Sequence, residues 1–235
     1  MKKLLTFIIL TLAFGCSYAQ FAKIVDKDGS VNLRKESNIK SRVIGKIKSG
    51  EIVYVYIGNE NSSWMPVDYY QENGSILSGY IHISRLLFID SYEEIPSVSE
   101  DENGASFIMR NFDIQIRSEK FNYKENQKYF AEKHYKDYSL PTYKGQNIWG
   151  MSSLIPKTHY ISIKVHIGNQ YVEIPEKDIE NLFDVNNASA HCFFDKKTET
   201  LYIISMNADG SDTYEVVWII EKGKYKGRKV YDTAL

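Results

Sequence analysis

The sequence predicts a mainly β protein made of two domains. Short stretches alternate apolar and polar side chains, as in 51–57 and 112–117, and a period of two is typical of half-buried strands. Glycines punctuate residues 20–90 at the spacing of short strands joined by turns. A chain of 235 residues can supply two modest hydrophobic cores.

The first 19 residues have the pattern of a signal peptide. Lys2 and Lys3 precede the apolar stretch 4–14, and Ala19 ends a cleavage context with small residues. The apolar stretch is shorter than the roughly 20 residues that a membrane-spanning helix needs. We therefore expect an exported protein, periplasmic or secreted, without a transmembrane segment.

The two cysteines leave one alternative open. Processing before Cys16 with attachment of lipid would give a tethered lipoprotein, whereas cleavage after Ala19 leaves Cys192 alone. A single cysteine forms no internal disulfide, so stability has to come from packed cores. The 29 basic and 30 acidic residues nearly balance, which gives no electrostatic signature of nucleic-acid binding.

Residues 20–90 carry the most specific motifs of the chain. These are Val31-Asn32-Leu33-Arg34, Trp64-Met65-Pro66-Val67 and Gly79-Tyr80-Ile81, followed by Leu86. The succession resembles the bacterial SH3-like (SH3b) family over residues 21–89. That resemblance implies a small SH3-like barrel, attached to exported proteins, that binds peptidoglycan or a peptide. Two departures are Glu36-Ser37, where the family usually has Gly-Pro, and Tyr80, where it often has a tryptophan. An insertion at 69–78 also lengthens the hairpin before the closing strand.

The alternation in 51–57 separates two faces of one strand. The resemblance implies that Val53 and Val55 are buried and that Tyr54 and Tyr56 lie on the outer face. Flat amphipathic rings suit peptide and glycan recognition. The predicted contact surface therefore consists of Tyr54, Tyr56, Trp64, Tyr69, Tyr70 and Tyr80. Trp64 and Tyr80 have an alternative reading as core aromatics.

Beyond residue 90 the pattern changes twice. Residues 91–106 are acidic, contain Pro96 and Gly104, and predict a linker between the domains. Residues 107–235 predict a mainly antiparallel β domain with one or two short helices, at 123–138 and from Pro175 to Phe183. Its expected strands are 112–117, 160–167, 171–174, 191–194, 201–206, 214–220 and 225–231, with a hairpin at Gly168-Asn169.

None of the residue patterns in the second domain predicts catalysis. Cys192 lies in a strand pattern, and the adjacent His191 should point to the opposite face, so the pair cannot form a nucleophile and base. His159 and His166 are an odd number of residues apart, which also predicts opposite faces. The sequence 207–212 resembles a turn more than a calcium loop. We expect no metal and no cofactor.

These observations predict an exported, non-enzymatic binding protein of the bacterial cell envelope. Two alternatives remain. One is a cell-wall hydrolase whose catalytic domain lies in 107–235. The other is an inhibitor or immunity-type protein directed against a wall-degrading enzyme.

Overall fold

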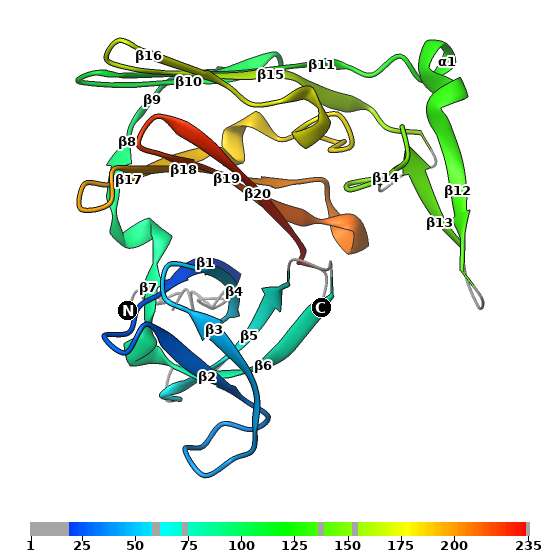
Figure 1. Cartoon of the computed structure of the whole chain (residues 1–235). Coiled ribbons are helices and arrows are strands. Elements are labelled where there is room, and N and C mark those ends of the chain that lie inside the picture. The colour runs from blue at the N-terminus through cyan, green and yellow to red at the C-terminus, as the bar shows by residue number, and fades with distance from the viewer. Residues whose placement is uncertain (1–18, 58–61, 72–74, 136–138, 152–154, 234–235) are drawn as a thin grey trace, which may run out of the picture.

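The computed structural model describes residues 19–57, 62–71, 75–135, 139–151 and 155–233 and confirms a mainly β protein. Its strands form four antiparallel sheets (Figure 1). The predicted signal peptide lies outside the described residues, apart from Ala19 at the start of β1. Within the described residues, no helix has the length and the apolar character to cross a membrane.

The N-terminal sheet has seven strands in the order β3-β2-β6-β5-β4-β1-β7. Side chains from all seven strands meet in one hydrophobic core, so the sheet curves around it. β3 and β7 stand at its two edges, which makes the sheet open rather than a closed barrel in the part of the chain described here. The SH3-like assignment stays a prediction. The strands are β1 (Ala19–Ile24), β2 (Ser30–Arg34), β3 (Val43–Lys48), β4 (Ile52–Tyr56), β5 (Trp64–Tyr70), β6 (Ile76–His82) and β7 (Leu86–Phe88).

The C-terminal part is a sandwich of two five-stranded sheets that share the largest hydrophobic core (Figure 1). Trp218 and Tyr160 face each other from the two sheets, with ring centroids 5.4 Å apart. One sheet consists of β20 (Lys224–Asp232), β19 (Tyr214–Glu221), β18 (Thr200–Asn207), β17 (His191–Asp195) and β8 (Glu93–Ile95). The other consists of β16 (Gln170–Glu173), β15 (Thr158–Ile167), β11 (Phe112–Lys120), β10 (Gly104–Met109) and β9 (Ser97–Asp101).

The predicted hairpin at Gly168-Asn169 is confirmed, and a second hairpin joins the last two strands. Ile167 pairs with Gln170 across Gly168-Asn169. Glu221 pairs with Lys224, and the two intervening residues both have positive φ, as a type I′ turn requires.

The predicted linker 91–106 is wrong, because this segment contributes strands to both sheets of the sandwich. β8 pairs with β17, and β9 pairs with β10. Ile95 is fully buried in the sandwich core, whereas every residue of β9 is exposed. An edge strand stabilised by backbone hydrogen bonds needs little apolar surface, so its composition resembles that of a linker.

The predicted helix 123–138 is also wrong over the described residues 127–135, and 136–138 lie outside the described residues. α1 (Tyr123–Asn126) is followed by strand β12 (Phe130–His134), which pairs with β13 (Ser139–Tyr143) and, through it, with β14 (Gln146–Asn147). Aromatic packing of Phe130 on Tyr143 outweighs the helical propensity of this stretch. The remaining short elements are 3₁₀ turns: η1 (Ile83–Arg85), η2 (Ile89–Ser91), η3 (Gln127–Tyr129), η4 (Glu176–Asp178), η5 (Asn187–Ser189) and η6 (Gly210–Asp212). The helix expected from Pro175 is therefore only η4.

A β-bulge corrects the prediction for the two histidines of β15. The register of β11 against β15 shifts between Arg117 and Ser118, which leaves Ile161 unpaired. The extra residue changes the phase of the strand. His159 and His166 consequently both flank buried core residues and share the face turned away from the core.

The N-terminal sheet packs its outer face against the β20-to-β8 sheet. Phe21, Ile52 and Tyr54 meet Val217 and side chains of β17, β18 and β20 in one cluster. We call this cluster the interdomain core, and its buried members are Phe21, Ile52, Tyr54, Ile89, Phe193, Tyr202, Ile204, Val217 and Tyr231. Tyr54 lies on the face opposite Val53, as predicted, but it is only 1% exposed. Its expected role on an open surface is therefore wrong.

One buried ion pair joins the two parts. The Lys23 ammonium on β1 donates to the Asp195 carboxylate on β17, and their side chains are 10% and 6% exposed. Burial acts to raise the pKa of Asp195, but hydrogen bonds from Lys23 and Thr198 outweigh it and lower the pKa to about 2.

Replacement of Asp195 by Asn should destabilise the protein by about 3 kcal/mol at pH 7, because it leaves the Lys23 charge buried without its counterion. A carboxyl whose folded pKa is depressed contributes stability above its unfolded pKa and loses it as the pH falls through its folded pKa. The wild type should therefore lose this contribution between about pH 4 and pH 2, and Asp195→Asn should not.

Urea unfolding of both proteins across this pH range measures the effect. Glu173→Gln is the control, since Glu173 pairs with Lys164 at 3.7 Å on an exposed surface, where a change of less than about 0.5 kcal/mol is expected. Equal effects of the two substitutions would contradict a stabilising role for the Lys23–Asp195 pair.

Candidate functional site

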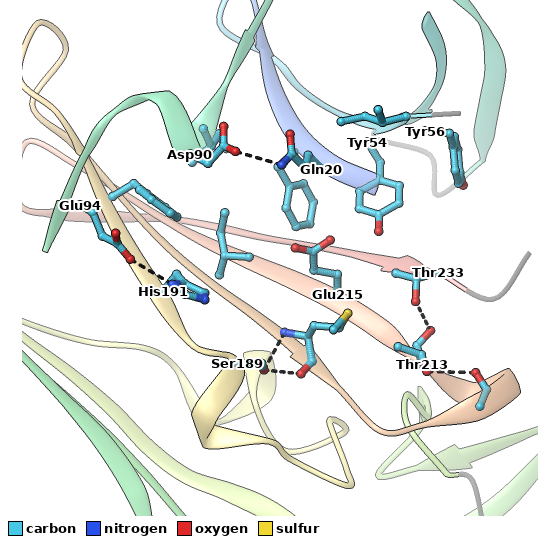
Figure 2. A pocket seen from close by; sticks show the side chains of 17 residues that line it. Gln20, Tyr54, Tyr56, Asp90, Glu94, Ser189, His191, Thr213, Glu215 and Thr233 are labelled. Carbon is cyan, nitrogen blue, oxygen red and sulfur yellow. Dashed lines mark hydrogen bonds and ion pairs between the residues drawn. The ribbon is translucent and has the colours of Figure 1, made fainter. Parts of the chain in front are cut away.

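A cleft of about 710 Å³ opens at one end of the interdomain core. It is lined by β1 and β4 of the N-terminal sheet and by β17, β18 and β19 of the C-terminal sheet (Figure 2). The volume falls within the range of small-molecule and peptide-side-chain sites, roughly 300–1,000 Å³. The walls are mostly apolar, and a small number of polar groups project into the cleft.

Glu215 is the central polar group of this cleft. It points toward the N-terminal sheet from β19, with Met206 and Tyr231 as its cross-strand neighbours. Figure 2 shows its carboxylate directed toward the hydroxyl of Tyr54. Burial raises the pKa of Glu215 to about 7, and the hydrogen-bonding influence of Tyr54 lowers it only in part. Near neutral pH this carboxyl can both gain and lose a proton.

The other polar groups of the cleft are already paired. The His191 Nδ1 and Glu94 Oε1 atoms are 3.0 Å apart, and Gln20 Nε2 donates to Asp90 Oδ2 at 2.9 Å. The Ser189 hydroxyl donates to the Met206 carbonyl and accepts from the Met206 N–H at 3.1 Å. Ser189 is thus held by backbone groups and is not set up as a nucleophile.

The six predicted contact residues do not lie together in the structure. Tyr54 and Tyr56 line the cleft, and the Tyr56 hydroxyl donates to Asp68 at 2.8 Å. Tyr70 packs on the interdomain core, with its ring centroid 4.5 Å from that of Tyr231. Tyr69 instead packs on the core of the N-terminal sheet.

Trp64 and Tyr80 lie apart from the cleft, and both are half-buried. The Trp64 ring meets His82 edge-on at 5.4 Å, and the Arg34 guanidinium lies 5.9 Å from its centroid. Tyr80 is paired with Arg34 across β2 and β6. These two residues do not join the other predicted contact residues in one surface.

The predictions for Cys192 and for 207–212 are confirmed. Cys192 is fully buried in the sandwich core, burial raises the pKa of its thiol, and His191 lies on the opposite face in the cleft. Residues 207–212 form the connection from β18 to β19 through η6. In the described part of the chain, no group of three or more His, Cys, Asp or Glu side chains is placed to hold a metal ion.

A second cavity, of about 940 Å³, lies at the opposite end of the interdomain core. Two ion pairs lie in its lining, because Lys23 pairs with Asp195 and Arg85 pairs with Asp26 at 3.0 Å. None of the six predicted contact residues lines this second cavity, whereas Tyr54 and Tyr56 line the Glu215 cleft. The Glu215 cleft is therefore the candidate site.

Sequence reasoning missed Glu215, His191, Glu94, Gln20 and Asp90 as residues of the site. One signal was present for Glu215, which is the only charged residue in the apolar stretch 214–220. The others come from segments distant in sequence, and only the packing of the two sheets brings them together.

Comparison with known proteins finds no matching family model, and neither the curated proteins nor the solved structures contain a significant match.

Replacement of Tyr54 by Ala should cost about 3 kcal/mol or more in unfolding free energy, because it removes a fully buried ring from the interdomain core. Tyr54→Phe keeps the ring and should cost less than about 1 kcal/mol. Thermal or urea unfolding measures both. Tyr171→Ala, at a tyrosine that is 51% exposed, is the control and should stay within about 0.5 kcal/mol. A Tyr54→Ala protein as stable as this control would show that the interdomain core does not form.

Glu215→Gln should stabilise the protein at pH 8 and have little effect at pH 5. A folded-state pKa above the unfolded value means that stability is lost as the pH rises from about 4.5 to about 7, because a buried charge then has to form. The neutral amide avoids this cost, which we expect to be about 1–2 kcal/mol at this partly exposed position. Unfolding curves at the two pH values test the sign, and a variant that is less stable at pH 8 would contradict it.

Proposed function

We propose that this chain is an exported, non-enzymatic binding protein of the bacterial cell envelope that recognises peptidoglycan or a peptide. The proposal places recognition in the Glu215 cleft rather than on an open surface of the N-terminal sheet. The observation that carries it is that Tyr54 and Tyr56, singled out by the SH3-like resemblance, line the same cavity as Glu215, a carboxyl with no cationic partner among the described residues. The signal-peptide pattern of residues 1–19 supports the envelope as the location.

The polar groups of the cleft favour binding over catalysis. A nucleophile needs an adjacent base, but Ser189 is bonded to backbone and His191 to Glu94. An apolar cavity with a few fixed polar groups is the usual form of a recognition site.

One observation favours a second candidate, a cell-wall hydrolase. A glutamic acid with a pKa near 7 can act as a general acid, and glycoside hydrolysis uses such a group together with a second carboxylate. Asp90 and Glu94 also line the cleft. Release of soluble fragments from purified sacculi, abolished by Glu215→Gln, would establish this candidate in place of simple binding.

Purified sacculi should retain the mature chain. Because Tyr56 lines the cleft, Tyr56→Ala should reduce the free energy of binding to sacculi by about 1–2 kcal/mol. The full mature chain is needed, since residues 20–90 alone would expose the N-terminal half of the interdomain core. Co-sedimentation at several protein concentrations measures the affinity.

Tyr171→Ala is the matched control, because it removes an exposed tyrosine from β16, far from the cleft. Trp64→Ala tests the rival surface near Arg34. Equal retention of Tyr56→Ala and wild type, with loss in Trp64→Ala, would move the site to that surface. No retention of the wild type would reject the peptidoglycan function.

A further inference from the structure

We propose that the cleft binds the primary ammonium group of a peptide, held by the Glu215 carboxylate with Tyr54 and Tyr56 around it. The inference deepens the proposed function, on which it rests for the identification of the ligand as a peptide. It names the chemical group that the cleft selects.

The described lining of the cleft carries more acidic than basic groups. Three carboxyl groups, those of Asp90, Glu94 and Glu215, line the cleft together with one imidazole, that of His191. Among the described residues of the lining there is no lysine and no arginine. A low-dielectric cleft lined by charge of one sign concentrates ligands of the opposite sign.

The pairing of these groups singles out one of them. Asp90 accepts from Gln20, and Glu94 faces His191. Glu215 forms no ion pair within the described chain, and its pKa is raised because burial disfavours its charge. A ligand cation is what would stabilise the charged form, since a buried carboxylate becomes favourable when it is paired and hydrogen-bonded.

The apolar part of the lining fits the rest of such a ligand. Ile204 and Phe193 form a buried apolar wall, and Met206 is 46% exposed beside Glu215. An unbranched thioether adapts its shape to irregular partners. An amine at the end of an aliphatic stem, as in a lysine-type side chain, could place its methylene groups on this wall and its ammonium group at Glu215. An anionic ligand would meet three carboxyl groups there and, among the described lining residues, no lysine or arginine.

We expect Glu215 to be the main source of the pH dependence of ligand binding, given the other titratable groups that surround it. Tyr54 and Tyr56 on β4 and Tyr231 on β20 have pKa values raised by burial, so they stay neutral at pH 8. Asp232 on β20 adds negative charge near the two β4 tyrosines. The His191–Glu94 pair on β17 and β8 forms the opposite wall. Protons and the ammonium group therefore compete for Glu215.

Calorimetric titration with two blocked tripeptides tests the proposal. The probes are acetyl-Ala-Lys-Ala-amide and the same peptide with its lysine Nζ acetylated, added to the full mature chain. The wild type should bind the free amine at least tenfold more tightly than the acetylated peptide at pH 8. At pH 5.5 the affinity for the amine should be roughly 30-fold lower, as expected for a carboxyl that titrates near pH 7.

Glu215→Gln should remove both the discrimination and the pH dependence. The matched control is Glu221→Gln, which changes a carboxyl on the same face of the same strand at the far end of the interface, and it should bind as wild type. His191→Gln should keep the pH dependence. Unfolding curves verify that each variant is folded.

Equal binding of the two tripeptides by the wild type, or no binding of either, would overturn the ammonium site. Discrimination that survives in Glu215→Gln would overturn it as well. Sacculi retained equally by wild type and Glu215→Gln would leave the proposed function intact while rejecting this inference. If the wild type discriminates between the two tripeptides but does not bind sacculi, the ammonium site is supported and the peptidoglycan function is rejected.

Discussion

Burial of β4 on both of its faces is the constraint on which the rest of the structure depends. Val53 and Val55 pack into the core of the N-terminal sheet, while Ile52 and Tyr54 pack into the interdomain core. A strand buried on both sides joins two hydrophobic cores into one cooperative unit. The N-terminal sheet therefore packs with the C-terminal sandwich as one unit. The cleft lies at one end of this contact, between the outer face of the N-terminal sheet and strands β17, β18 and β19.

The sequence predicts the strands of the second domain well because each hairpin is a local event. The alternation of side chains and the glycines in the turns are enough to place β15, β16, β19 and β20. These glycines, Gly168 and Gly223, have positive φ in the structure. The predictions fail where distant segments decide the outcome. Residues 93–101 are strands because β17 and β10 supply hydrogen-bonding partners, and Phe130–His134 is a strand because Tyr143 and its neighbours pair with it. The bulge at Ile161 is another such case, since it shows only in the register against β11.

The candidate site was predictable only in part, for the same physical reason. The SH3-like resemblance indicated the face that carries Tyr54 and Tyr56, but nothing in residues 20–90 revealed that a second sheet covers this face. Tyr70 lies in the segment 69–78 that the resemblance predicts as an insertion. Its ring meets that of Tyr231 edge-on, and its carbonyl accepts from Lys229 at 3.4 Å. Tyr70 thus contributes to the contact between the two parts.

The shared use of Tyr54 links ligand binding to the stability of the interdomain core. Tyr54 stacks on Tyr231 with ring centroids 4.8 Å apart, and its hydroxyl faces Glu215 in the cleft. A ligand that binds only when the two sheets are packed stabilises that packing, by an amount that grows with its concentration relative to its dissociation constant. The Lys23–Asp195 pair fixes the opposite end of the interface without contacting the cleft. One end of the interface is therefore held by an internal ion pair, and the other carries a carboxyl whose charge is disfavoured until a cation from outside joins it.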